Sequence, residues 1–408
     1  MGICFRFASR SILSSWMLVC WAGWLPAGED WQRESEPILA GFHHVYQPCV
    51  VETGGEWRYR MWFFGWAAAP TNPDDPGCDA IYLARSNDLR QWEVYCRDGG
   101  WQRAPYEPAT WAPVIHASDR WYDAWHNGDP SVVLKDARYY MAYSATSADF
   151  GEVAGYPFRM ACCVMGAVSD DGIRWTKSAE PLLIAEQDSF PPQPARGRIG
   201  DFHRPCLRHE NGVWRLWFDY VCPRPSVSNA AVAEDGDRFQ LGMGYAQNHG
   251  DFLQPGSFVL QHELRRPLLD NWPNPEVIKV GNRYHSFADP SGYPLPADWP
   301  PDGKGWASRQ IREAVSDDGV HWTKLGFIAP DPDTPACQVP QALVTHIDGR
   351  TWLYLFYATQ VGYRERTGLI GLSQPTDEPI GSRRYQYEYD RLRAMRRPVP
   401  DYPAGVGR

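Results

Sequence analysis

The chain repeats one pattern of apolar and polar positions five times. Each copy begins with a residue followed by proline, continues with a short apolar run and a turn containing Gly, Asp or Asn, and ends with a second run rich in aromatic side chains. Short apolar runs bounded by turn residues are typical of β-strands paired as hairpins. The prolines are Pro48, Pro130, Pro205, Pro275 and Pro340, which follow one another at steps of 82, 75, 70 and 65 residues.

A second motif follows the paired runs. It reads SNDLRQW at 86–92, SDDGIRW at 169–175 and SDDGVHW at 316–322, with a weaker copy, AEDGDRF, at 233–239. The Asp-Gly pair predicts a tight turn in which glycine takes a positive φ, and the tryptophan is expected to pack between sheets. Five units of roughly 70 residues, each with about four antiparallel strands, predict an all-β fold, a five-bladed β-propeller. Two β-sandwiches would not explain five copies of one pattern.

The N-terminus has the pattern of a secretory signal. Arg6 and Arg10 precede the apolar run ILSSWMLVCWAGWLPA at 12–27, and charged residues begin at Glu29. The run is shorter than the roughly 20 residues that a spanning helix needs, so a membrane anchor is the weaker interpretation. We therefore expect a signal peptide at 1–27, a propeller at 28–390 and a C-terminal tail at 391–408. The mature protein would be secreted or periplasmic, with no membrane span.

The composition agrees with a protein of many short strands and tight turns rather than a nucleic-acid-binding one. Aromatic residues make up 14% of the chain, with 20 Trp and 21 Tyr, and the 36 Gly and 36 Pro favour tight turns. The net charge of −9 argues against a broad nucleic-acid-binding face. Eight cysteines follow the signal; their spacing does not predict a zinc site, and an exported protein could pair some of them in disulfides.

The five X-Pro positions predict two rings of side chains around the propeller axis. The innermost strand of each blade lines the central channel, and the residues before and after each proline would share a face by the two-residue period of a strand. The first ring would hold Gln47, Asp129, Arg204, Asn274 and Val339, and the second ring Cys49, Ser131, Cys206, Glu276 and Gln341. Four of the five residues in the first ring are polar, which indicates a site rather than an ordinary core.

Five repeats, an Asp-Pro pair at the head of an inner strand and the S-x-D-G-x-x-W turns resemble the five-bladed propeller glycosidases. These are the arabinanase and xylosidase group of glycoside hydrolase family 43, the invertases and the neoagarooligosaccharide hydrolases. In the arabinanase-type pattern, blade one supplies an Asp base, blade two an orienting Asp and blade three a Glu acid. Asp129 matches the blade-two Asp, but Gln47 stands at the blade-one position and cannot act as a base. Blade three reads GDFHRP, without Glu, and its nearest ionisable groups are Asp201 and His203.

The resemblance implies catalysis by a proton donor and a second carboxylate across the scissile bond. The neoagarooligosaccharide hydrolases resemble a variant with a His acid, which favours His203. Simpler roles remain open, among them a turn-capping Asp129, a salt bridge from Glu276 to Arg204, and a structural hydrogen bond from Asp219. The candidate catalytic residues are Asp129, Glu276, Asp219, His203 and Asp201.

Other polar and aromatic groups are candidates for binding a substrate. A guanidinium such as that of Arg204 suits a carboxylate or sulfate. Trp125 and Trp272 precede two inner strands, where a sugar ring could stack on them. The candidate binding residues are Gln47, His44, Arg204, Asn274, Gln341, Trp125 and Trp272. Carboxylates are not clustered enough to predict a metal, so no cofactor is expected, although some relatives hold a channel calcium ion.

The sequence thus favours a secreted glycoside hydrolase that acts on a plant or algal poly- or oligosaccharide, with inversion. A non-catalytic carbohydrate-binding propeller is the alternative, favoured by Gln47 in place of an acid. A sialidase-like enzyme is weaker, because sialidases usually have six blades and an arginine trio. The sequence does not define the sugar, the linkage or the oligomeric state.

Overall fold

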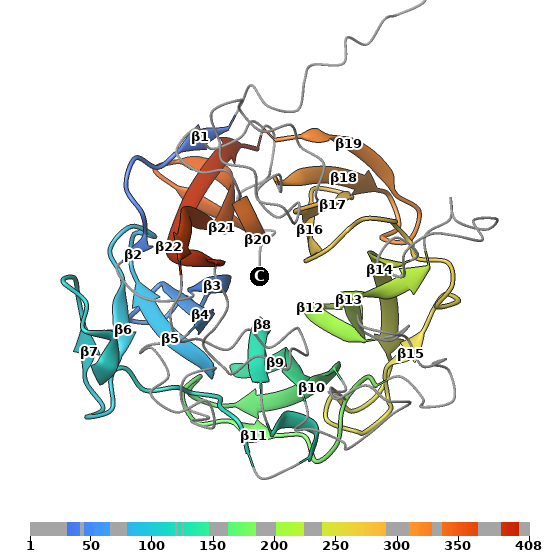
Figure 1. The fold of residues 1–408 in the computed structure, drawn as a ribbon, viewed down its shortest axis with the longest axis horizontal. Coiled ribbons are helices and arrows are strands. Elements are labelled where there is room, and N and C mark those ends of the chain that lie inside the picture. The colour runs from blue at the N-terminus through green and yellow to red at the C-terminus, as the bar shows by residue number, and fades with distance from the viewer. Residues whose placement is uncertain are drawn as a thin grey trace, which may run out of the picture.

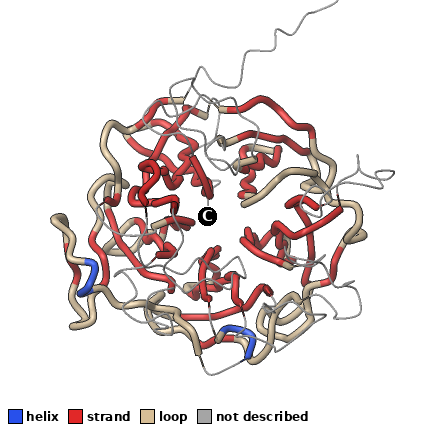
Figure 2. The backbone as a smooth tube through the Cα atoms, viewed as in Figure 1, coloured by secondary structure: helices blue, strands red, loops and turns tan. Residues whose placement is uncertain are grey.

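Five antiparallel sheets stand around a central axis as the blades of a propeller (Figures 1 and 2). The computed structural model describes residues 31–40, 45–65, 80–118, 121–124, 126–146, 162–184, 201–223, 239–290, 310–328, 337–365 and 385–399. Within these ranges the only helices are two single turns, η1 (Pro108–Thr110) and η2 (Trp121–Asp123). The all-β, five-bladed fold expected from the repeats is confirmed.

The strands of each blade follow one another from the axis outward. Blade one contains β3 (Tyr46–Glu52), β4 (Tyr59–Gly65), β5 (Ala80–Ser86), β6 (Glu93–Tyr95) and β7 (Trp101–Gln102). Blade two contains β8 (His126–Lys135), β9 (Arg138–Thr146), β10 (Cys162–Ser169) and β11 (Thr176–Lys177). Blade three contains β12 (Phe202–Glu210), β13 (Val213–Pro223), β14 (Phe239–Asn248) and β15 (Val259–Leu260). Blade four contains β16 (Glu276–Val280), β17 (Arg283–Ala288), β18 (Arg312–Ser316) and β19 (Thr323–Phe327).

Blade five is built from both ends of the described chain. Its inner strands are β20 (Cys337–Ile347), β21 (Arg350–Glu365) and β22 (Tyr385–Pro398), and β22 pairs with β1 (Gln32–Arg33) and β2 (Leu39–Ala40). This pairing closes the propeller without a fourth strand from the fifth repeat. Because β22 stays paired with β21 as far as Pro398, the propeller continues past residue 390, where a tail was expected to begin.

The X-Pro pairs of blades one, two, three and five lie on the innermost strands, and Asn274-Pro275 directly precedes β16. These pairs do not have regular strand geometry. The residue before each proline has a positive φ: 48° at Gln47, 52° at Asp129, 46° at Arg204, 52° at Asn274 and 50° at Val339. In blades one, two, three and five the pairing register also shifts across this point. Such a bulge turns the chain out of the ladder. The two-residue strand period used to place the rings therefore does not apply here.

The S-x-D-G-x-x-W turns join neighbouring blades. Gly172 and Gly319 have φ values of +74° and +82°, as expected for the Asp-Gly position. The carbonyl of Gly172 accepts a hydrogen bond from Trp62 Nε1 of blade one at 3.0 Å. The carbonyl of Gly319 accepts one from Trp217 Nε1 of blade three at 2.9 Å. Each turn therefore docks on a buried tryptophan of the preceding blade.

The described residues carry neither a disulfide nor a membrane helix. No disulfide joins any two of the seven cysteines that the structure describes. Within the same ranges, no helix has the length and apolar character that crossing a bilayer requires.

Candidate active site

The second ring links all five blades through side chains that accept backbone hydrogen bonds. In every case the donor is the N–H two residues after the proline of the next blade. The pairs are Cys49 with Val132 (3.2 Å), Ser131 with Leu207 (2.8 Å), Cys206 with Val277 (3.2 Å), Glu276 with Ala342, and Gln341 with Val50 (3.1 Å). This closed ring of bonds gives the second ring a structural task.

Two candidate site residues belong to this second ring. Glu276 lies 2.5 Å from Arg208 Nη2, so its ion-pair partner is Arg208 rather than the expected Arg204. Burial raises the pKa of Glu276, although Arg208 opposes the shift. Gln341 uses both ends of its amide, because Nε2 donates to the carbonyl of Ala342 at 2.6 Å. Neither side chain is left with a polar group directed at a ligand.

Three polar side chains hold the backbone of the first ring in its positive-φ conformation. Ser144 Oγ accepts a hydrogen bond from the N–H of Arg204 at 2.7 Å. Asp219 Oδ2 accepts one from the N–H of Asn274 at 2.8 Å, and Asp289 Oδ2 accepts one from that of Val339 at 3.0 Å. Non-glycine residues at positive φ are strained, and these bonds between blades offset part of that strain. Asp219 thus has a structural contact as well as its possible chemistry.

Sequence reasoning missed Asp289. It follows β17 in blade four as Asp219 lies late in β13 of blade three, and both side chains are fully buried. Asp289 Oδ1 also accepts a hydrogen bond from Asn274 Nδ2. The signal was present in the sequence, since FADPS at 287–291 occupies the place in its repeat that FDYV occupies at 218–221.

Buried polar atoms without hydrogen-bond partners gather at the first ring. A buried donor or acceptor that bonds nothing costs about 1–3 kcal/mol, so most such groups are paired with protein or water. Seven such atoms lie in and beside this ring, which makes it the candidate site for water or a polar ligand. They are Gln47 Oε1, Asp129 Oδ1, His203 Nδ1, Arg204 Nε, Asp219 Oδ1, Asn274 Oδ1 and Gln338 Nε2. Gln338 was not among the expected site residues.

Asp129 is a buried carboxylate that stays ionised. Its residue is only 4% exposed, and Oδ2 lies 3.9 Å from His126 Nε2. Burial disfavours the charge, but His126 and Arg204 outweigh it, and the pKa of Asp129 lies below its usual range. A carboxylate held in this state suits a general base or an electrostatic role rather than a proton donor.

His203 lies opposite Asp219 on the neighbouring strand of blade three. His203 Nδ1 lies 3.7 Å from Asp219 Oδ1, and both atoms lack another partner. Burial lowers the pKa of His203 to about 4, against the pull of the Asp219 carboxylate, so the imidazole is neutral at pH 7. The same carboxylate lies 3.1 Å from Arg204 Nη1.

Arg204 is surrounded by negative charge. Burial opposes the charge on its guanidinium, but Asp219, Asp129 and Asp289 outweigh that effect and raise the pKa of Arg204. Because three carboxylates compensate one guanidinium, Arg204 has less positive charge to offer a substrate carboxylate or sulfate than its sequence position suggested.

The remaining candidate site residues are Asp201, Trp272, His44 and Trp125. Asp201 is buried immediately before β12 and adds to the burial effect that raises the pKa of Cys162. Trp272 is fully buried, and its Nε1 donates to Ser286 Oγ at 2.9 Å, so it has no face on which a sugar could stack, contrary to expectation. His44 and Trp125 lie outside the described residues.

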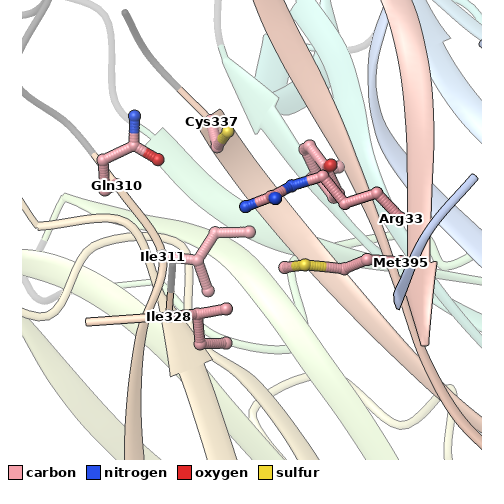
Figure 3. A pocket seen from close by; sticks show the side chains of 7 residues that line it. Arg33, Gln310, Ile311, Ile328, Cys337 and Met395 are labelled. Atoms are coloured by element: carbon pink, nitrogen blue, oxygen red, sulfur yellow. The ribbon is translucent and has the colours of Figure 1, made fainter. Parts of the chain in front are cut away.

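A separate pocket lies between blades four and five (Figure 3). Its lining is largely apolar, including Ile311, Ile328 and Met395, with Arg33 and Gln310 as polar neighbours. None of the residues of either ring lines it. Among the described residues, no group of three or more His, Cys, Asp and Glu side chains is arranged to hold a metal ion.

Comparison with known proteins identifies the fold but not a family. No family model matches the chain, and no curated protein sequence matches it. The solved structure of a BT0996–RGII complex is similar, with a TM-score of 0.54 and 14% identity over 90% of this protein and 92% of that one. Zg3597, a family 117 glycoside hydrolase of the marine bacterium Zobellia galactanivorans, gives a TM-score of 0.52 and 13% identity over 91% and 90% of the two proteins. The protein therefore has the five-bladed propeller fold found in glycoside hydrolases.

Proposed function

We propose that this protein is a secreted glycoside hydrolase that cleaves a plant or algal poly- or oligosaccharide at the channel mouth. The observation that supports this most is the cluster of orphaned polar atoms around the ionised Asp129. A sugar hydroxyl can both donate and accept a hydrogen bond. It can donate to the carboxylate and amide oxygens of the first ring, and it can accept from Arg204 Nε and from Gln338 Nε2 beside the ring. The similarity in fold to Zg3597 agrees with a carbohydrate substrate.

In the proposed reaction, Asp129 acts as the carboxylate and His203 as the proton donor. Asp129 stays ionised, so it can activate a water or stabilise the positive charge that develops on the sugar. His203, once protonated, can deliver its proton to the leaving oxygen, and the Asp219 carboxylate 3.7 Å away stabilises the imidazolium form. We expect the two reacting groups to lie about 6.5–9.5 Å apart across the substrate, which gives inversion.

A non-catalytic carbohydrate-binding propeller is the second candidate. One observation favours it: Gln47, at the position of the blade-one base, offers an orphaned amide oxygen that can bind a hydroxyl but cannot accept a proton at neutral pH. In that case the same ring would hold a glycan without breaking a bond.

The test is hydrolysis of a panel of plant and algal glycans by the mature protein, with the anomer of the first product read by NMR. We expect Asp129→Asn to lower kcat on the order of 10²–10⁴-fold in a protein that still folds. The matched control is Asp170→Asn. The Asp170 side chain is 88% exposed and forms a surface ion pair with Arg138. Binding of glycans without cleavage would favour the second candidate instead. N-terminal sequencing of the exported protein tests removal of residues 1–27.

A further inference from the structure

His126 lies beside the Asp129 carboxylate at the start of β8. Its Nε2 is 3.9 Å from Asp129 Oδ2, which is too long for a hydrogen bond but close enough for a strong electrostatic contact. The imidazole packs edge-to-face on Phe64 of blade one, with ring centroids 5.0 Å apart. The side chain is 16% exposed, so the ring sits between the core of two blades and the channel mouth.

Gly128 makes this placement of the imidazole possible. A Cβ at Gly128 would come within 2.7 Å of Phe64 Cδ2 and 2.9 Å of His126 Nε2. Real Cβ atoms do not approach other atoms so closely, so any side chain at this position would displace one ring or the other. The glycine in the sequence HNGDP is therefore required by the His126 position, two residues away from it.

A buried polar clamp fixes the backbone on both sides of His126. Lys177 Nζ, from the outermost strand β11, donates to Asp123 Oδ2 at 2.6 Å and to Asn127 Oδ1 at 3.3 Å. Asn127 Nδ2 donates to the Asp123 carbonyl at 2.9 Å. Asp123 and Asn127 are fully buried. Three side chains in one blade thus hold the segment that carries His126, although none of them touches the channel.

We propose that His126 is a positioning residue, which keeps the Asp129 carboxylate oriented toward the channel mouth during the reaction proposed above. Oδ2 faces the imidazole, while Oδ1 is the atom without a partner. The contact therefore involves one carboxylate oxygen and leaves the other without a protein partner. This inference rests on the proposed function for its catalytic consequence, but not for the contact itself.

The groups around Asp129 determine how its pKa should respond to the loss of the His126 imidazole. Burial pushes the pKa of Asp129 up, and the imidazole is the neighbour that most opposes it. Removing the imidazole nitrogen should therefore raise the pKa of Asp129, while Arg204 still limits the rise. The polar and titratable groups that face Asp129 from the other elements are Arg204 and His203 on β12, Ser144 on β9 and Cys162 on β10.

The experiment compares His126→Phe with His126→Gln in the full-length mature protein. Phenylalanine keeps the packing on Phe64 but lacks a polar nitrogen, whereas glutamine restores an N–H donor. Titration of ¹³C-labelled Asp carboxyls, with the Asp129 signal assigned by its loss in Asp129→Asn, gives the pKa of Asp129 without any substrate. The pH profile of kcat/KM gives the catalytic effect. His346→Phe is the matched control, because His346 is exposed near the C-terminal end of β20.

We expect His126→Phe to raise the pKa of Asp129 by about one unit, to move the acid limb of kcat/KM the same way, and to lower kcat about tenfold with KM nearly unchanged. His126→Gln should have a kcat and an Asp129 pKa close to those of the wild type. An unchanged pKa of Asp129 in His126→Phe overturns the proposal. An equal loss of kcat in His126→Phe and His126→Gln, with the wild-type pH profile of kcat/KM, also overturns it. A shifted titration in a protein that cleaves no glycan supports the positioning role and counts only against the proposed hydrolysis.

Discussion

Gln341 on β20 accepts a hydrogen bond from the backbone N–H of Val50 on β3 at 3.1 Å, although the two residues are 291 positions apart. This bond joins the last blade to the first and completes the second ring. The outer edge is closed separately, where β1 and β2 pair with β22. The propeller is therefore closed twice. Side-chain hydrogen bonds join β20 to β3, among them the bond from Thr345 Oγ1 to Glu52 Oε2 at 2.8 Å, and backbone pairing closes the rim.

Replacing Gln341 with leucine should destabilise the propeller without touching the proposed catalytic groups. Leucine leaves the buried N–H of Val50 without an acceptor, which costs about 1–3 kcal/mol. Urea unfolding of the two proteins measures the difference. Gln91→Leu is the control, because Gln91 is exposed and its side chain closes no ring. Equal stability of Gln341→Leu and wild type would mean that the remaining contacts between blades five and one are enough to close the fold.

Glu276→Gln should act mainly on stability. The amide oxygen can still accept from Ala342, but the partly exposed guanidinium of Arg208 loses its counter-charge at 2.5 Å. Removing one partner of a buried pair costs about 3–5 kcal/mol, and the retained hydrogen bond favours the lower end of that range. Glu52→Gln, in the half-exposed pair with Arg58, should cost less than about 1 kcal/mol. A large loss of kcat at unchanged stability would instead return Glu276 to the catalytic candidates.

The repeats allowed the fold to be predicted because each blade contains the same hairpin pattern. The residue before each proline, the apolar run and the aromatic run recur at nearly even steps. The structure places four of the five prolines on innermost strands and Pro275 directly before β16. The position of Asp219 near the same rim also followed from strand geometry, since β13 returns beside β12 with Asp219 opposite His203. These predictions depended on the repeated hairpin pattern, which can be read locally in the sequence.

The division of labour between the two rings could not be predicted in this way. It depends on bonds between blades, such as Glu276 with Arg208 and Gln341 with Val50, whose partners are distant in sequence. It also depends on the positive φ before each proline, which a strand period does not contain. Trp272 shows the same limit, because its position before an inner strand suggested a rim, whereas a hydrogen bond to Ser286 holds it in the core.

His203 should make the protein less stable in mild acid. Its pKa is about 4 in the folded state and about 6.5 when unfolded, so between these values only the unfolded chain binds the proton. The free energy of unfolding therefore falls as pH drops from 6.5 toward 4, by about 2 kcal/mol at pH 5, and the effect is absent above pH 7. Urea unfolding at pH 7 and pH 5 should show this loss in wild type relative to His203→Gln. The same pH dependence in both proteins would contradict a buried, neutral imidazole.

The same pKa determines how hydrolysis should depend on pH. If His203 donates the proton, the active form has a protonated imidazole and an ionised Asp129, and their pKa values, about 4 and below the usual range, allow both only in acid. With a glycan that the protein cleaves, kcat/KM should be greatest at or below about pH 4 and fall about tenfold per unit above it. His203→Gln should lower kcat on the order of 10²–10⁴-fold and remove this alkaline limb. Activity that stays level from pH 5 to pH 8, or that survives in His203→Gln, would assign the proton to another group, and Asp201, buried at the head of the same strand, would be the next residue to replace.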